Sequence, residues 1–236
     1  MNYPGSKNGA GVFQTIINQI PPHDVYIEGF AGSGAIVRMK RPAHVSVVID
    51  VYPSCTSILR DALPGAVVIN DDVITTLRST VDASGYPEEN CFVYLDPPYL
   101  KRDIDGTPVR SWQGNIYEHE FDTVEQHKTL LALIKSLKCM VMISGYWSQL
   151  YAAELKDWRT LSYNAMTRAG RPAKEFLWMN YPEPIALHDY SFLGENRTDR
   201  QRIKRKIKRW EERLANMPTL EKRVLLQAME SLRHAP

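Results

Sequence analysis

Five short apolar runs, separated by longer stretches with helical spacing, limit this chain to a small number of folds. The runs are rich in β-branched residues and are almost continuously apolar, instead of alternating between apolar and polar positions. Such runs are typical of strands that helices cover on both faces of a parallel sheet. The pattern therefore predicts an α/β fold, open and wound on both sides of its sheet. The expected strands are residues 24–29, 45–50, 66–70, 91–95 and 139–144.

Two later segments, residues 158–164 and 174–180, are interpreted as a hairpin at one edge of this sheet. They flank the sequence Ala-Gly-Arg-Pro at residues 169–172, which is typical of a tight turn. The chain has 236 residues, of which 44% are hydrophobic, and this suffices for one sizeable core but hardly for two independent domains. We therefore expect one main domain, residues 1–182, followed by an extension.

The extension, residues 183–236, differs from the rest of the chain in its charge. Residues 197–213 hold nine Lys or Arg and three acidic residues, whereas the formal net charge of the whole chain is only +2. Apolar residues recur there at helical spacing, so residues 197–214 predict a basic amphipathic helix with one face that packs. A last helix should run from Thr219 to about Arg233. The apolar stripe consists of Ile203, Ile207, Trp210 and Leu214.

Cysteine usage and hydropathy argue against several classes of protein. The three cysteines lie far apart in the sequence, so they indicate neither a disulfide framework nor a zinc site, and a reducing cytoplasm fits them. No apolar run approaches the roughly 20 residues that span a bilayer. The first residues also lack the apolar segment of a signal peptide. We expect a cytoplasmic protein that requires no metal and no membrane. The sequence does not determine its oligomeric state.

A glycine-rich segment, Glu-Gly-Phe-Ala-Gly-Ser-Gly-Ala at residues 28–35, follows the first predicted strand and leads into a helix. Glycines let the chain turn tightly and bring its backbone close to a ligand. The spacing does not match the dinucleotide pattern G-x-G-x-x-G, because position 31 is Ala. The segment is therefore either a ligand-binding loop or a tight turn without a ligand.

Acidic residues end the next two predicted strands. Asp50 ends the strand 45–50, and Asn70, Asp71 and Asp72 end the strand 66–70. A carboxylate at the end of the strand beside a glycine-rich loop is where an α/β sheet holds ribose hydroxyls. Each acid alone is more typical of a helix N-cap than of a ligand contact. The glycine-rich loop after the first strand and the acidic ends of the next two strands together favour a cofactor that contains a nucleoside.

The tetrapeptide Asp96-Pro97-Pro98-Tyr99 directly follows the apolar strand 91–95. Successive prolines fix φ near −65° and remove two backbone donors, so the chain leaving this strand is stiff and offers bare carbonyl groups. A carboxylate and a carbonyl fixed side by side can accept both protons of one amino group, and Tyr99 adds a ring face. The alternative is a rigid turn with an incidentally exposed tyrosine.

These motifs, in this order, resemble those of Dam-like (D12 class) N6-adenine DNA methyltransferases, in particular the short phage and prophage members. The likeness rests on Tyr3-Pro-Gly-Ser-Lys7, Phe30-Ala-Gly-Ser-Gly34 and the tetrapeptide at residues 96–99, and it extends through Ile143-Ser-Gly-Tyr146 and Glu175-Phe-Leu-Trp178. It covers about residues 1–182. The resemblance implies a Rossmann-like methyltransferase fold with a mixed seven-stranded sheet, whose last strand is antiparallel, and S-adenosylmethionine as cofactor.

The resemblance also implies residue roles. Tyr3 and Lys7 would hold the methionine end of the cofactor, Asp50 the ribose and Asp72 the adenine. The full cofactor set is Tyr3, Lys7, Phe30, Gly32, Gly34, Asp50 and Asp72. Asp96 and the Pro97 carbonyl would grip the target amine, and Tyr99 would stack on the target base. The catalytic set is Asp96, Pro97, Pro98 and Tyr99.

The implied substrate is double-stranded DNA with a flipped adenine, because a base inside the duplex cannot reach a buried methyl donor. Phosphate contacts would give affinity, and bidentate Arg contacts to guanine could give specificity. For each basic residue the alternative is a solvated surface charge. The candidate DNA-binding residues are Lys101, Arg102, Arg110, Arg168, Arg171, Arg202, Arg205 and Arg209.

The sequence leaves the finer function open. Only about 60 residues separate the glycine-rich loop from Asp96, which leaves no room for the target-recognition insert of the longer family members, so no recognition sequence is implied. A site-specific DNA methyltransferase of a restriction-modification or regulatory system in a bacterial host is the expectation. The alternatives are an RNA adenine-N6 methyltransferase, a catalytically inactive nucleic-acid-binding module and a cytosine-N4 methyltransferase, although the last class more often begins the tetrapeptide with Ser.

Overall fold

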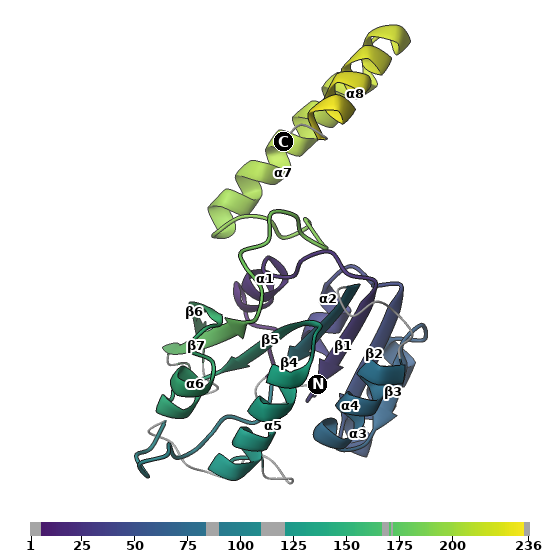
Figure 1. The fold of residues 1–236 in the computed structure, drawn as a ribbon. Helices are drawn as coiled ribbons and strands as arrows, with labels where there is room; N and C mark the ends of the chain where they lie inside the picture. The colour runs from purple at the N-terminus through teal and green to yellow at the C-terminus, as the bar shows by residue number, and fades with distance from the viewer. Residues whose placement is uncertain (1–5, 84–89, 110–120, 167–169, 171, 234–236) are drawn as a thin grey trace. The chain divides into compact units, whose positions relative to one another are not determined.

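The computed structural model describes residues 6–83, 90–109, 121–166, 170 and 172–233. The chain divides into two compact units, Met1–Phe192 and Leu193–Pro236 (Figure 1). The boundary lies ten residues beyond the predicted one at residue 182.

Residues 183–192 belong to the first unit because hydrogen bonds tie them to its early segments. The His188 N–H donates to the Ile20 carbonyl oxygen at 2.9 Å, and the Asp189 carboxylate accepts from the Arg41 N–H at 2.9 Å. The prolines at 182 and 184 mark the end of the last strand, and the contacts that follow them are long-range in sequence. The local composition therefore indicated that the strands end near residue 182. It did not indicate that the first unit continues to Phe192.

The first unit contains a seven-stranded sheet with the order β3-β2-β1-β4-β5-β7-β6. The strands β1 to β5 pair in parallel, whereas β7 is antiparallel to β5 and to β6. This arrangement confirms the predicted α/β class, the mixed sheet and the edge hairpin. The strands are β1 (Val25–Gly29), β2 (Val45–Asp50), β3 (Val67–Asn70), β4 (Cys91–Leu95), β5 (Met140–Gly145), β6 (Arg159–Met166) and β7 (Pro172–Met179).

Helices cover both faces of the sheet, as the continuous apolar strands predicted. Neighbouring residues of β1 enter different cores: Ile27 packs with residues of α4, α5 and α6, and Tyr26 packs with residues of α1, α2 and α3. This alternation follows from the two-residue repeat of a strand. The helices are α1 (Val12–Ile17), α2 (Ala35–Met39), α3 (Pro53–Ala62), α4 (Val73–Ala83), α5 (Val124–Ser136) and α6 (Gln149–Glu154).

The carboxyl ends of the five parallel strands meet at one edge of the sheet. Asp50 ends β2, the glycine-rich loop follows β1, and Asp96 follows β4, while Asp72 lies two residues beyond β3. Because the order is β3-β2-β1-β4, these elements line up along that edge in the same succession. Ligands of open α/β sheets bind outside the carboxyl ends of the strands.

The second unit contains the helices α7 (Arg197–Ala215) and α8 (Thr219–Arg233), close to the bounds expected from the sequence. The Asn196 side chain begins α7 by accepting the Asp199 N–H at 2.9 Å. No residue of α7 is buried, and Ile207 and Trp210 of the predicted apolar stripe are about half exposed. None of the described helices is both long and apolar enough to cross a membrane.

Candidate active site

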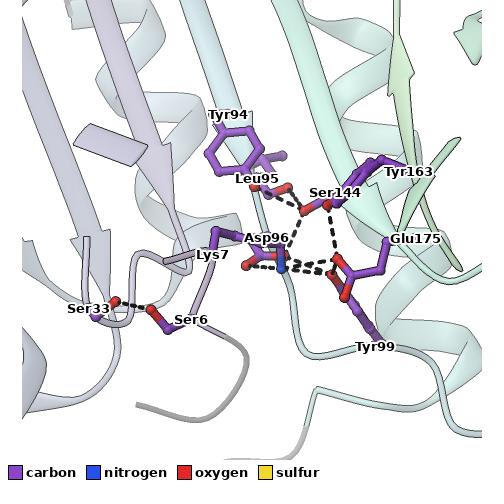
Figure 2. A network of polar contacts seen from close by, with 10 residues as sticks. All are labelled: Ser6, Lys7, Ser33, Tyr94, Leu95, Asp96, Tyr99, Ser144, Tyr163 and Glu175. Atoms are coloured by element: carbon purple, nitrogen blue, oxygen red, sulfur yellow. Dashed lines mark hydrogen bonds and ion pairs between the residues drawn. The ribbon is translucent and has the colours of Figure 1, made fainter. Parts of the chain in front are cut away.

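Asp96 is the first residue after β4, a strand buried between β1 and β5. Its carboxylate oxygens both accept hydrogen bonds from the Lys7 ammonium, each at 2.7 Å. The Ser144 hydroxyl, on the neighbouring strand β5, donates to Oδ1 at 2.6 Å (Figure 2). The N-terminal segment and two central strands thus converge on one carboxylate.

The prolines after Asp96 leave a carbonyl group available beside it. Pro97 is buried, and no described residue donates a hydrogen bond to its carbonyl oxygen. Tyr99 follows with a partly buried side chain, and its ring lies edge-on to the ring of Tyr146 at a centroid distance of 4.6 Å. The predicted catalytic set at residues 96–99 thus lies at the carboxyl end of β4, and its catalytic role stays a prediction.

Glu175 completes this cluster, although the sequence assigned it no role. It lies on β7, opposite Tyr163 of β6 in the antiparallel register. Its Oε2 accepts from the hydroxyls of Tyr99 and Tyr163, each at 2.9 Å, and lies 3.7 Å from the Lys7 ammonium (Figure 2). The available signal was an acidic residue directly before the apolar run at residues 176–179 of β7.

Burial governs the electrostatics of this cluster. It raises the pKa of the Asp96 carboxyl group, and the Lys7 ammonium and the Ser144 hydrogen bond oppose that rise, whereas Glu175 adds to it. Burial also raises the pKa of Tyr99 and of Tyr163, and the carboxylates Asp96 and Glu175 add to both shifts. Both phenols therefore remain protonated and act as hydrogen-bond donors to carboxylates.

The glycine-rich loop contains three residues in the left-handed backbone region, two of which are glycines. Phe30, Gly32 and Gly34 have positive φ angles of 56°, 52° and 65°. A Cβ atom on Gly34 would lie 2.4 Å from the Leu59 side chain, so this glycine also permits close packing of α3. The left-handed residues alternate along the loop, which turns the chain tightly between β1 and α2.

Asp50 and Asp72 lie at the carboxyl edge of the sheet, as expected. The carboxylate of each accepts hydrogen bonds from backbone N–H groups of the protein itself. The Asp50 carboxylate is buried and accepts the N–H groups of Gly32 at 2.7 Å and Tyr52 at 2.8 Å, which ties the loop to β2. The Asp72 carboxylate is exposed and accepts the Thr75 N–H at 2.8 Å, as a helix cap does. Their roles toward ribose and adenine stay predictions.

The N-terminal segment joins the loop to the cluster around Asp96. The Ser6 hydroxyl lies 2.8 Å from the Ser33 hydroxyl within the loop, and Lys7, next in sequence, is only 5% exposed (Figure 2). Tyr3 lies outside the described residues. Backbone amides, hydroxyls and carboxylates along one edge match the groups that bind a nucleoside-bearing cofactor such as S-adenosylmethionine.

The predicted nucleic-acid contacts are spread over both units. Lys101 forms an ion pair with Asp122, and the Arg102 guanidinium donates to the Gly106 carbonyl at 2.9 Å. Arg110, Arg168 and Arg171 lie outside the described residues.

On α7, Arg202 pairs with Asp199 at 2.8 Å, and the Arg205 guanidinium donates to the Gln201 carbonyl at 3.3 Å. Arg209 is exposed. These arrangements are those of surface charges on a solvated helix, so contact with nucleic acid stays a prediction.

Comparisons with solved structures find methyltransferases. The N-methyltransferase NodS from Bradyrhizobium japonicum is 9% identical over 73% of this chain and 92% of its own, with a TM-score of 0.47. A putative RNA methyltransferase from Pyrococcus horikoshii is 11% identical over 73% and 80%, with a TM-score of 0.45. The magnesium protoporphyrin IX methyltransferase from Synechocystis, solved with bound SAM, is 8% identical over 72% and 76%, with a TM-score of 0.44.

No protein-family model matches the chain, and no curated protein matches it in sequence. The similarities to solved structures are distant, so the substrate has to be argued from the chemistry of the site.

Proposed function

We propose that this protein transfers a methyl group from S-adenosylmethionine to the N6 amine of a flipped adenine in double-stranded DNA. The observation that carries the proposal is the hydrogen bonding of Asp96. Both of its oxygens accept from an amino nitrogen, that of Lys7, and the Pro97 carbonyl next to it has no described donor. Two acceptors of this kind suit an exocyclic amine, which has two protons to donate.

The residues of the chain contribute mainly position and electrostatics. One N–H of the substrate amine donates to Asp96 and the other to the Pro97 carbonyl. Adenine N6 is a poor nucleophile because its lone pair is delocalised into the ring, and these two hydrogen bonds favour a more tetrahedral nitrogen whose lone pair points at the methyl group. When bound, S-adenosylmethionine supplies that methyl group on a positively charged sulfur. Fixed acceptors of this kind lower a barrier without reorganisation.

The substrate amine has to displace the Lys7 ammonium from Asp96. The displaced ammonium retains a partner, because Glu175 lies 3.7 Å from its Nζ. Tyr99, whose hydroxyl is held by Glu175 at 2.9 Å, then presents its ring to the base. The methionine end of the cofactor would be held by the N-terminal segment, and its nucleoside by the glycine-rich loop with Asp50 and Asp72.

Adenine in DNA is favoured over the other amines by the order of the three motifs and by Asp at the start of the tetrapeptide. The flipped base costs a few kcal/mol to extrude, which contacts to the DNA must offset. Methylation of adenine in RNA is the nearest alternative, since the flipped base is the same in either polymer.

Modified-base sequencing of DNA from a methylation-free host that expresses the protein tests the proposal. We expect N6-methyladenine in DNA from the host that expresses the wild-type protein. DNA from a host that expresses the Asp96→Ala variant should contain none. Labelled methyl transfer to unmethylated DNA and to RNA of the same sequence separates the polymers, and transfer to RNA alone would contradict the DNA assignment. A wild-type protein that does not bind S-adenosylmethionine would instead be a nucleic-acid-binding module.

A further inference from the structure

Among the residues that the structure describes, the cluster around Asp96 contains one cationic side chain, Lys7, and two anionic ones, Asp96 and Glu175. The Lys7 ammonium lies 2.7 Å from Asp96 and 3.7 Å from Glu175. The side chains of Lys7 and Glu175 are 5% and 11% exposed, and that of Asp96 is 18% exposed. Water therefore screens these charges only weakly. One buried ammonium is shared between two carboxyl groups (Figure 2).

Toward the described residues, both carboxyl groups act as hydrogen-bond acceptors. Both oxygens of Asp96 accept from Lys7, and the Glu175 Oε2 accepts from two phenols, Tyr99 and Tyr163. An ionised carboxylate only accepts hydrogen bonds, which is the role that each group has here. The ammonium offsets one of the two negative charges. The described residues of the cluster therefore carry a formal excess of one negative charge.

An unbalanced charge away from water is unfavourable until an opposite charge approaches it. Asp96 has Lys7 as a direct partner, so the second carboxylate, Glu175, is the source of the excess. The pairing of Tyr163 with Glu175 across the β6–β7 register holds that carboxylate in place. A second cation that came to this edge of the sheet would be attracted by it.

We propose that Glu175 makes the pocket prefer the positively charged sulfonium form of the cofactor over its neutral thioether product. The inference rests on the proposed function only in placing methyl transfer at Asp96, which brings the sulfonium to this cluster. Transfer breaks the S–CH₃ bond and forms an N–CH₃ bond, the proton leaves the nitrogen for solvent, and the sulfur becomes neutral. The attraction to Glu175 is lost in the same step, which favours release of the spent cofactor.

The proposal is tested by calorimetry without nucleic acid. Three probes are compared: S-adenosylmethionine, sinefungin, which carries an amino group in place of the methylated sulfur, and S-adenosylhomocysteine. The wild-type protein should bind the two cations about tenfold more tightly than the thioether, since one partly screened charge contributes an effect of this order. In Glu175→Gln the ratio should fall close to one, while the thioether affinity stays within about twofold.

Tyr163→Phe is the matched control. It removes one hydrogen bond from Glu175 but no charge, so the preference for the cations should persist. Lys7→Met is a second variant that does not depend on the folding of Glu175→Gln. It removes the compensating ammonium, so the ratio of sulfonium to thioether affinity should rise even though both affinities fall with the loss of a methionine-end contact.

Three results would overturn the inference: no preference in the wild-type protein, an equal loss for all three probes in Glu175→Gln, or a ratio that does not rise in Lys7→Met. Failure of the proposed function has a different signature. If the protein prefers the charged ligands but methylates neither DNA nor RNA, the inference about Glu175 and the cofactor stands. The proposed substrate is then wrong.

Discussion

Replacing Asp96 by Asn separates substrate chemistry from cofactor binding. The amide keeps an acceptor for the Ser144 hydroxyl, now 2.6 Å from Oδ1, but it loses the charge and one acceptor and points an N–H donor at the incoming amine. Loss of one fixed acceptor of this kind costs about 3 kcal/mol in the transition state, so kcat/KM should fall by roughly 10²–10³. The fold should survive.

Removing one partner of a buried ion pair costs about 3–5 kcal/mol when the other charge is left unpaired. In Asp96→Asn the Lys7 ammonium retains Glu175 at 3.7 Å, so the free energy of unfolding should fall by only about 1–2 kcal/mol. Urea unfolding measures that change. A fall of about 3–5 kcal/mol in the free energy of unfolding would show that Glu175 does not replace Asp96 as the partner of Lys7.

The assay is labelled methyl transfer to unmethylated DNA, run beside calorimetric titration with S-adenosylmethionine. Cofactor affinity should stay within about tenfold, because Asp96 is assigned to the target amine. Ser144→Ala is the matched control, which removes the hydrogen bond to Asp96 but keeps its charge and should cost about tenfold. If Asp96→Asn loses cofactor affinity as severely as activity, the division of roles between Asp96 and the glycine-rich loop is wrong.

Three further changes probe other parts of the chain. Gly32→Val places a side chain at a φ of 52°, on the backbone that the cofactor approaches, and should abolish S-adenosylmethionine binding; unchanged calorimetric affinity would contradict the pocket. Burial lowers the pKa of His127 to about 4, below its ordinary 6.5, so its contribution is full above pH 6.5 and is lost as the pH falls toward 4. The wild-type protein should lose about 2 kcal/mol more than His127→Leu between pH 7.5 and pH 5 in urea unfolding, and equal losses would refute this. Reversing Arg202, Arg205 and Arg209 to Glu should weaken binding to every duplex and flatten the dependence of log K on log salt. A changed methylation sequence in that variant would make α7 a specificity element instead.

The strands were predictable because burial on both faces leaves a strong local signal. The segments expected at 45–50 and 91–95 match β2 and β4 residue for residue, and the helix expected at 197–214 ends one residue later. Each of these elements is defined by apolar residues within one window of the sequence. The signal of the tetrapeptide at residues 96–99 is equally local, because the strand, the acid and the prolines follow one another directly.

Long-range contacts left no comparable signal. Residues 183–192 were assigned to the extension, whereas hydrogen bonds to Ile20 and Arg41 keep them on the first unit. For Asp72 the local signal is clear, but it is compatible with two roles. Its helix-capping role could be expected from its position alone, but the same position at the carboxyl edge is also where a cofactor contact would occur. The sequence alone therefore does not distinguish a helix cap from a cofactor contact at Asp72.

Glu175 shows why the site as a whole could not be predicted from its motif. It reaches Tyr99 only because β7 runs antiparallel between β5 and β6, which places Phe176 opposite Gly145 and Glu175 opposite Tyr163. A shift of one residue in that register would turn the glutamate to the other face of the sheet. The charge around Asp96 is therefore set by sheet topology, while the acceptors beside it are set by the tetrapeptide. A variant that altered the β6–β7 register and left residues 96–99 intact would keep the motif and lose the electrostatic environment in which we propose it acts.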